Sequence, residues 1–288
     1  MDKIAIFPNE IKDRDLVCTA NIAEKAAAMG KEVLVPDKFK GLMRGVKGVV
    51  FLPEDRILNS GLSLALVVGG DASIIRCARR AAVYGVPIIG VNMGRLGYLA
   101  ETEADETDLI EKALSGEAGI EKRMMLSFGI TKKSGEVTGK NPALNDIVLT
   151  STGRTNRIVN IKLCFAGKDA MSVPMCGDGV IVSTPTGSTA YALAAGGPVI
   201  DPSLECMSAV PICPHSLSSR PLIFSGETTL QLINDGRENI NVSADGCEEY
   251  MIEPGEYVTV KKSEYYSLFL KVRGGSFYEV LHRKMTER

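Results

Sequence analysis

"LALVVGGDASIIRCARRAAVYGVPIIGVN", residues 64–92, predicts a strand, a helix and a second strand in succession. The unbroken apolar run Leu64–Val68 is typical of a parallel strand that is buried on both faces. The segment after Ser73 has a helical composition, and residues 86–92 form a second apolar run. Because a strand, a crossover helix and a parallel strand form a right-handed unit, this stretch predicts an open parallel α/β sheet.

The residues before this stretch continue the same alternation. Residues 3–7 (KIAIF) and 32–36 (EVLVP) are short apolar runs, and residues 15–29 between them are rich in Ala, with apolar side chains at helical spacing. Gly30 follows at the place where a glycine often ends a helix. Residues 1–100 are therefore predicted to form a Rossmann-like α/β domain with a parallel sheet.

The composition changes near residue 101. After an acidic segment that predicts a helix, residues 101–270 contain short alternating strands separated by turn residues, which predicts a larger, sandwich-like β-rich domain. The predicted strands cover residues 125–133, 147–150, 158–168, 228–234, 240–245, 256–262 and 265–272. A short helix is predicted at residues 277–284, and residues 271–288 are expected to rejoin the first domain.

The composition also excludes several classes of function. The chain of 288 residues has a formal net charge of −2 and no long Lys/Arg block, so no nucleic-acid-binding face is expected. The N-terminus lacks the apolar segment of a signal peptide, and no apolar run approaches the ~20 residues of a membrane span. The seven cysteines include no C-x-x-C pair, which predicts reduced thiols and no zinc site. We expect a soluble, cytoplasmic protein with no membrane partner and no metal held by its own side chains.

The first candidate site is Gly69–Ser73, which follows a buried strand and opens a helix. Ligands bind at this end of the strands in open α/β sheets, and a helix N-terminus attracts phosphate. Asp71 is then unexpected, because a carboxylate repels phosphate. Either Asp71 or Ser73 caps the helix, or Asp71 accepts a proton from an attacking hydroxyl beside a phosphate site.

Two further polar clusters are candidates. Gly90–Tyr98, which contains Asn92, follows the next strand and is expected at the same edge of the sheet, either facing the first loop or as an ordinary interdomain loop. The pair Asn145 and Asp146 precedes another strand. It offers donors and acceptors that can bind the two hydroxyls of a ribose, or it forms a simple turn.

The fourth candidate is the uncharged stretch Val182–Pro198, "VSTPTGSTAYALAAGGP", with Asp178 just before it. It has no Lys after its glycines, as a P-loop requires. Hydroxyls and backbone amides can bind an uncharged adenosine or an amide, and Tyr191 can lie against a base. The alternative is a helix of small residues that packs closely on a sheet.

Five segments together resemble the NAD kinase family. They occur in the family's order from about Lys3 to Val280, and the fourth of them is the most specific. The segments are GGDAS (residues 69–73), GVNMGRLGYLAE (90–101), ALNDIVL (143–149), GDGVIVSTPTGSTAYALAAGGPVIDP (177–202) and PICPHSLSSRPLIF (211–224).

The resemblance implies transfer of a phosphoryl group from ATP or polyphosphate to the 2′-hydroxyl of the adenosine ribose of NAD, giving NADP. Asp71 matches the general base of the family. Gly70 and Ala72 flank it beside the pyrophosphate, and Asn92 lies nearby. The family implies Mg²⁺, or another divalent cation, held by the donor phosphates.

The same resemblance assigns NAD binding and oligomerisation to residues 101–270. Asn145 and Asp146 match the family's pair that binds ribose and nearby groups, and Asp178 matches the carboxylate on the nicotinamide side. Arg157 matches a position that contacts NAD from a neighbouring subunit. The family forms homodimers and homotetramers, so a homo-oligomer is expected.

The remaining matches include two departures from the family. Thr189, Ala190 and Tyr191 match the segment that lines the dinucleotide, whereas Ala194 stands where the family often has Ser. Ala72 replaces the last Gly of the family's Gly-Gly-Asp-Gly loop. Alanine fits there without strain only if its φ is negative, which we expect. Two alternatives stay open: a non-catalytic NAD(P) sensor on the same fold, and a kinase for another hydroxyl substrate.

Overall fold

In the computed structural model the chain forms two units, Met1–Lys122 with Ser267–Arg288 and Arg123–Tyr266. The structure describes residues 2–94, 97–139, 142–152, 158–166, 172–216 and 218–286. Two long strands, β7 (Gly119–Thr131) and β18 (Tyr257–Lys271), each contribute residues to both units.

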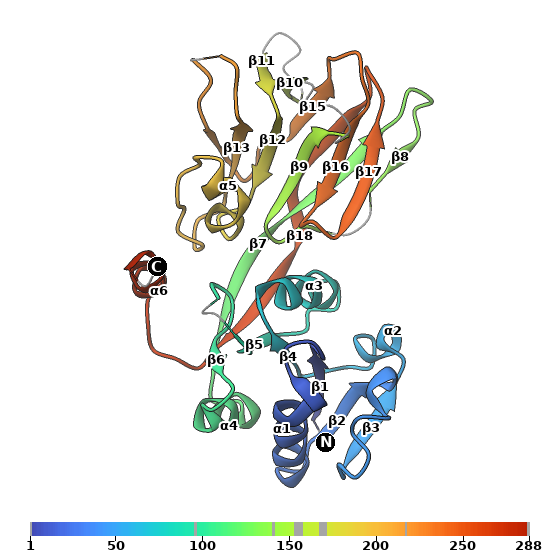
Figure 1. Ribbon diagram of the computed structural model, residues 1–288, viewed down its shortest axis with the longest axis vertical. Helices are drawn as coiled ribbons and strands as arrows, with labels where there is room; N and C mark the ends of the chain where they lie inside the picture. Colours follow the sequence, from blue (N-terminus) through green and yellow to red (C-terminus); the bar gives the residue numbers. More distant parts are fainter. Residues whose placement is uncertain are drawn as a thin grey trace. The chain divides into compact units, whose positions relative to one another are not determined.

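The first unit is built on a parallel sheet with the strand order β5-β4-β1-β2-β3 (Figure 1). These strands are β1 (Lys3–Pro8), β2 (Glu32–Pro36), β3 (Val49–Leu52), β4 (Leu64–Gly69) and β5 (Ile88–Asn92). The chain runs from β1 outward to β3 and then returns to the other side of β1 for β4 and β5. The strand order therefore reverses between β1 and β4, and open α/β sheets bind ligands at the carboxyl ends of strands at such a point.

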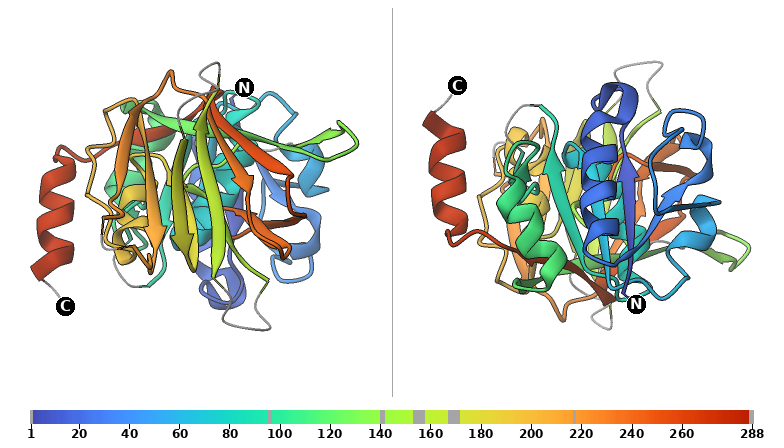
Figure 2. Two further views of the ribbon diagram at one scale, coloured as in Figure 1. Left: turned by 90° about the horizontal axis from the view of Figure 1, so that it is seen from above. Right: turned by 90° about the horizontal axis from the view of Figure 1, so that it is seen from below.

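Helices cover this sheet. α1 (Val17–Ala28) and α4 (Thr107–Ser115) pack on one face, where buried residues of both share a core with the strands (Figure 2, right). α3 (Asp71–Ala82) packs against β4 and β5 and buries Ile74 and Ala78.

The segment that holds β3 and α2 (Glu54–Ile57) was not predicted from the sequence. α6 (Phe277–Thr286) ends the described chain and has no buried residue.

The second unit contains two antiparallel arrangements of strands. One joins β11 (Ser172–Gly177), β10 (Val159–Phe165), β15 (Leu230–Asn234) and β18. The other has six strands in the order β14-β13-β12-β9-β16-β17. Its strands are β14 (Leu222–Ser225), β13 (Cys206–Ile212), β12 (Gly179–Ser183), β9 (Asp146–Ser151), β16 (Ile240–Ala244) and β17 (Glu248–Ile252). Alternate residues of both enclose one apolar core.

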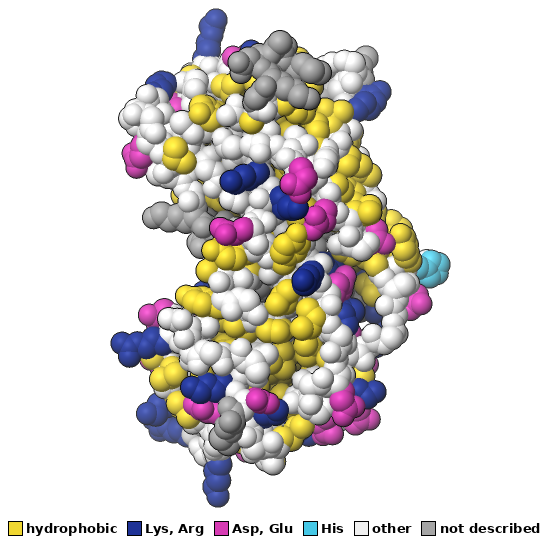
Figure 3. All heavy atoms as spheres, turned by 180° about the vertical axis from the view of Figure 1, so that it is seen from behind, with side chains coloured by type: hydrophobic (Ala, Val, Ile, Leu, Met, Phe, Trp, Pro, Cys, Tyr) yellow, Lys and Arg dark blue, Asp and Glu magenta, His cyan; other side chains and the backbone are white. Residues whose placement is uncertain are grey.

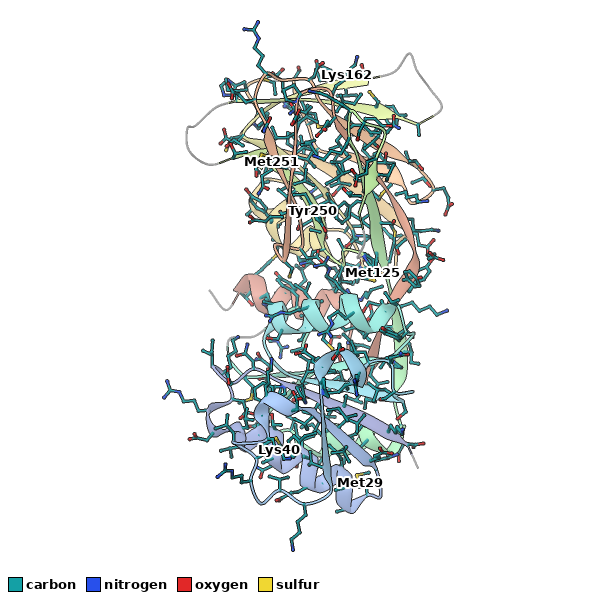
Figure 4. The ribbon with its side chains drawn as sticks, turned by 90° about the vertical axis from the view of Figure 1, so that its right-hand side faces the viewer. Met29, Lys40, Met125, Lys162, Tyr250 and Met251 are labelled. Carbon is teal, nitrogen blue, oxygen red and sulfur yellow. The ribbon has the colours of Figure 1, made fainter. Side chains whose placement is uncertain are left out.

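Neighbouring side chains of β17 point to opposite faces of the strand, as the strand period of two requires (Figure 4). Tyr250 of β17 packs edge-on against Phe128, with 5.8 Å between the ring centroids, whereas its neighbour Met251 is 53% exposed. Met125 of β7 is fully buried. The predicted strands at residues 256–262 and 265–272 are one continuous strand, β18, because no Gly or Pro separates them.

The outer face of the six-stranded sheet is also covered. The short helices η3 (Gly187–Thr189) and α5 (Tyr191–Ala194) lie there, and Ala192 packs with Val148, Ile181 and Val210. This explains why β12 is buried on both faces. The structure confirms the predicted fold class, a parallel α/β domain with a β-rich second domain.

Among the described residues, no helix has the length and apolar character needed to cross a bilayer. On the face seen in Figure 3, acidic and basic side chains are interspersed, without a broad basic area.

Candidate active site

Asp71 is the first residue of α3, at the carboxyl end of β4. Its carboxylate does not cap the helix, because Gly70 is the N-cap residue and no side-chain cap bond is formed. Asp71 Oδ2 instead accepts a hydrogen bond from Tyr98 N at 2.8 Å, and Oδ1 accepts one from Leu99 N at 3.3 Å. The predicted cap role of Asp71 is therefore wrong, and the carboxylate faces a second loop. Ser73 is not a cap either, since its hydroxyl accepts a hydrogen bond from Asn9.

Asn92 lies beside this position, at the end of β5. It is paired with Gly69 across the sheet, and Met93 N donates to Gly69 O at 3.1 Å. Asn92 is 2% exposed, and its Nδ2 donates to Gly94 O and Glu103 Oε2. Its Oδ1 has no partner among the described residues. A buried acceptor without a partner is rare in proteins, so this atom is an unexplained polar group at the edge of the sheet.

Lys12 brings a positive charge to the same edge of the sheet. It lies in the loop after β1, and its Nζ occupies the place where any side chain at position 70 would begin. Gly70 therefore allows the ammonium to approach the first turn of α3. A cation at a helix N-terminus strengthens the attraction for an anion. The sequence analysis missed Lys12, because a lone Lys in a charged loop has no distinctive pattern.

Ala72 is the second residue of α3 and is exposed, with helical backbone of negative φ. The expectation for this residue is confirmed: the backbone here suits alanine, and no glycine is needed for a left-handed conformation.

A second cluster, in the second unit, contains Asn145 and Asp146. A carboxylate from a distant part of the chain, Asp245, orders this turn. Its two oxygens accept hydrogen bonds from the backbone N–H groups of Leu144, Asn145 and Asp146 at 2.7, 2.8 and 2.9 Å. Asp245 itself has a left-handed φ of 51°, a conformation that Asp tolerates better than most residues. The turn predicted at Asn145 and Asp146 is therefore present, and a third residue, Asp245, holds it in place.

The uncharged stretch after β12 packs directly on this turn. Ser183 pairs with Asp146 across the sheet, and Thr184 N donates to Asn145 O at 2.9 Å. At Gly187 a Cβ would overlap Asn145 O, so only glycine allows this close approach. Asn145 Oδ1 has no partner among the described residues. The structure therefore brings the third and fourth sequence candidates together.

The following residues present side chains to solvent. Tyr191, at the start of α5, is 45% exposed, so it is not a core tyrosine. Thr189 and Ala190 are half-buried, and Ala194 is exposed. An exposed aromatic ring and small side chains are suited to contact a base or a nicotinamide.

Two of the predicted residues do not join this cluster. Asp178 precedes β12 and is exposed, whereas the cluster lies at the other end of that five-residue strand, roughly 16 Å away at about 3.3 Å per residue. Arg157 lies outside the described residues.

In the second cluster, Asp146 carries a carboxyl group that is almost completely buried, since the residue is only 6% exposed. Burial raises the pKa of the Asp146 carboxyl to about 7, and the neighbouring charge of Asp245 acts in the same direction. Because the folded state then binds a proton more tightly than the unfolded state, the group lowers stability progressively as pH rises from about 4 to about 7.

The Asp146→Asn variant should remove this penalty. The melting temperature of the variant relative to wild type should rise between pH 4 and 7 and stay constant above pH 7. Thermal unfolding across this range measures the effect, with Asp235→Asn, an exposed carboxylate of the same unit, as the control. A difference that does not change with pH would show that Asp146 is not desolvated in this way.

The first unit thus carries a carboxylate, a lysine and a helix N-terminus at the strand-order reversal. The second unit carries a turn and a loop that are rich in uncharged polar groups.

Comparisons with known proteins identify the particular family. Residues 52–118 match the ATP-NAD kinase N-terminal domain and residues 144–272 the ATP-NAD kinase C-terminal domain. The NAD kinase of Caldanaerobacter subterraneus subsp. tengcongensis is 37% identical over 290 residues, with complete coverage of both chains. That of Symbiobacterium thermophilum is 33% identical over 99% of each chain. The chain belongs to the NAD kinase family, and its activity is that of an NAD kinase.

Solved structures agree with this assignment. The crystal structure of an NAD kinase from Archaeoglobus fulgidus in complex with ATP has a TM-score of 0.77 at 26% identity, covering 99% of both chains. Yeast NADH kinase complexed with NADH has a TM-score of 0.87 at 21% identity, covering 99% of this chain and 87% of the other, and shares the fold.

Proposed function

We propose that this chain transfers the γ-phosphoryl group of ATP to the 2′-hydroxyl of the adenosine ribose of NAD, with Asp71 as the general base. The observation that carries the proposal is the Asp71 carboxylate at the first turn of α3, beside the strand-order reversal. A carboxylate beside a phosphate-binding position is placed to accept a proton from an attacking hydroxyl. The Archaeoglobus relative in complex with ATP supports ATP as the donor, and polyphosphate remains a second donor to test.

The chemical step moves one proton and one phosphoryl group. Asp71 accepts the proton of the 2′-hydroxyl, the ribose oxygen forms a bond to the γ-phosphorus, and the bond to the β–γ bridging oxygen breaks to release ADP. Such reactions depend mainly on positioning and charge stabilisation. Lys12 and the N–H groups at the start of α3 supply positive charge on the phosphate side.

A divalent cation bound to the donor phosphates is part of the proposal. Among the described residues no three His, Cys, Asp or Glu side chains are grouped to hold a metal ion. Mg²⁺ bound by the ATP phosphates would neutralise their charge. We infer that the metal enters with ATP.

The acceptor binds to the residues of the second unit. Asn145 and Asp146 contact the ribose and nearby groups, and Thr189, Ala190 and Tyr191 line the dinucleotide. The unpartnered Oδ1 of Asn145 supports this, since it can accept a hydrogen bond from a ligand hydroxyl. Gly70, Ala72 and Asn92 would lie beside the pyrophosphate. Asp178, on the nicotinamide side, and Arg157 are proposed from the family pattern alone, and so is a homo-oligomer.

Analogues of NAD test the position of transfer. An NAD that lacks the 2′-hydroxyl of the adenosine ribose should bind but accept no phosphoryl group from [γ-³²P]ATP, whereas an analogue that lacks only the 3′-hydroxyl should be labelled. Labelling of the 2′-deoxy analogue would contradict the proposed acceptor. A protein that labels neither NAD nor these analogues but does label another alcohol would be a kinase for a different substrate.

Tyr191→Ala should raise the KM for NAD more than it lowers kcat. Stacking on a base is present both before and during the reaction, and it contributes about 1–3 kcal/mol per base, or roughly tenfold in KM. The exposed Tyr84 of the first unit provides the matched control, as Tyr84→Ala. Steady-state kinetics and the melting temperature of one preparation separate the outcomes: an unchanged KM would exclude the stacking role.

A further inference from the structure

The loop Gly97–Leu99 lies against the proposed base. Two consecutive backbone N–H groups, those of Tyr98 and Leu99, donate to different oxygens of the Asp71 carboxylate at 2.8 and 3.3 Å. A Cβ at position 97 would overlap Asp71 Oδ1 and would lie only 2.9 Å from Asp71 Cγ. Gly97 thus allows the backbone to approach the carboxylate far more closely than any other residue would.

Contacts outside the catalytic residues hold this loop. Glu101 N donates to Gly90 O at 3.0 Å, and β6 (Thr102–Glu103) pairs with β5. Leu99 is buried. On the outer side, Lys284 Nζ of α6 lies 4.1 Å from the centroid of the Tyr98 ring, a cation–π contact. The residues that carry the two amide donors therefore also have contacts other than those with Asp71.

Fixing both oxygens has a consequence for catalysis. A carboxylate held at only one oxygen can rotate about its Cβ–Cγ bond, whereas two donors from one rigid loop define the direction of its remaining lone pairs. Rate constants respond steeply to such orientation: a misplacement of about 1 Å costs on the order of a hundredfold.

We propose that Gly97–Leu99 is a positioning element for the base, which orients the Asp71 carboxylate toward the acceptor hydroxyl. The inference rests on the proposed role of Asp71. The alternative is that these hydrogen bonds only attach the loop to α3. Their loss would then lower stability and leave turnover unchanged.

The first test compares Gly97→Ala with Gly41→Ala. Gly41 is an exposed glycine of the same unit, and a Cβ there would meet nothing within 4 Å. Gly97→Ala should lower kcat by about a hundredfold with KM values for NAD and ATP within a few-fold of wild type, and Gly41→Ala should stay within about twofold. A folded Gly97→Ala protein with wild-type kcat would overturn the proposal.

The second test asks whether the loop acts through Asp71. In the Asp71→Asn background, Gly97→Ala should cause no further loss of kcat, because the base that it misplaces is already absent. A full additional loss would mean that the loop acts on another group and would overturn the inference. High turnover by Asp71→Asn alone would instead refute the proposed base, so the two failures are distinguishable.

A third variant covers the case in which Gly97→Ala does not fold. Replacement of Tyr98 by its α-hydroxy acid analogue exchanges one backbone N–H for an ester oxygen and keeps the side chain. We expect kcat to fall by about tenfold, because one of two orienting donors is lost. The same ester at Tyr84, whose N–H donates to Ala81 O in the last turn of α3, is the control. Equal kcat for the two esters would contradict the proposal.

Discussion

Asp71→Asn should lower kcat by about 10²–10⁴-fold while NAD still binds, because general-base catalysis typically contributes that much. Asparagine has the size of aspartate and can still accept a backbone hydrogen bond through its amide oxygen, but it cannot take up the proton of the ribose hydroxyl. The fold should persist, since Asp71 makes no cap bond to α3. Initial-rate kinetics of NADP formation, together with NAD binding by calorimetry, measure both parts.

The matched control for this variant is Asp37→Asn. Asp37 is an exposed carboxylate in the same unit, at the start of η2 (Asp37–Phe39). Its substitution should leave kcat within about twofold. If Asp71→Asn also keeps kcat within a few-fold of wild type, Asp71 does not act as the base.

Asp245→Ala should cause the largest loss of stability and of NAD affinity in the second unit. The substitution leaves three backbone N–H groups at residues 144–146 without their carboxylate. Hydrogen bonds to charged groups contribute about 1.5–3 kcal/mol each, and alanine at a left-handed φ costs about 1 kcal/mol more. Water will form hydrogen bonds with some of the exposed N–H groups. We therefore expect the free energy of unfolding to decrease by about 3 kcal/mol and the melting temperature to fall by roughly 10 °C.

The Asp245→Ala variant should bind NAD more weakly, in addition to being less stable. Because Asn145 and Asp146 lose the contacts that order their turn, the KM for NAD should rise by at least tenfold, or about 1.4 kcal/mol. Asp245→Asn tests the charge separately, since asparagine tolerates the left-handed conformation and keeps one acceptor. That variant should be less impaired than Asp245→Ala and should lower the pKa of Asp146, which the Asp245 charge raises. Wild-type KM and stability in Asp245→Ala would refute the ordering role.

The parallel sheet could be predicted from the sequence because each of its longer strands is a continuous apolar run. β4 and β5 are bounded by glycines and polar residues, and α1 is bounded by Gly30, so local signals suffice there. β3 and α2 were missed, since four-residue elements carry too little periodicity. The pairing of β9 with β12 and β16 depends on contacts between distant segments, which a single sequence does not reveal.

The candidate residues could be located individually in the sequence. The contacts by which other residues hold them in place could not be predicted. Asp245 lies about a hundred residues beyond the turn that it orders, and its Asp-Gly sequence predicts only a hairpin turn. Likewise, Gly97 looks like one of several loop glycines, and only the structure shows the Asp71 carboxylate against it. Long-range backbone contacts of this kind leave no local pattern, whereas the polar, uncharged loop at residues 182–198 is visible at once in the sequence.

The most direct measurement is the formation of NADP by the purified wild-type protein from NAD, ATP and Mg²⁺, detected with an NADP-specific dehydrogenase and by ³¹P NMR of the 2′-phosphate. The account predicts steady NADP formation that requires all three components and is nearly abolished by Asp71→Asn. A wild-type protein that binds NAD but forms no NADP with ATP or polyphosphate would contradict the account and would support a non-catalytic nucleotide sensor on the same fold.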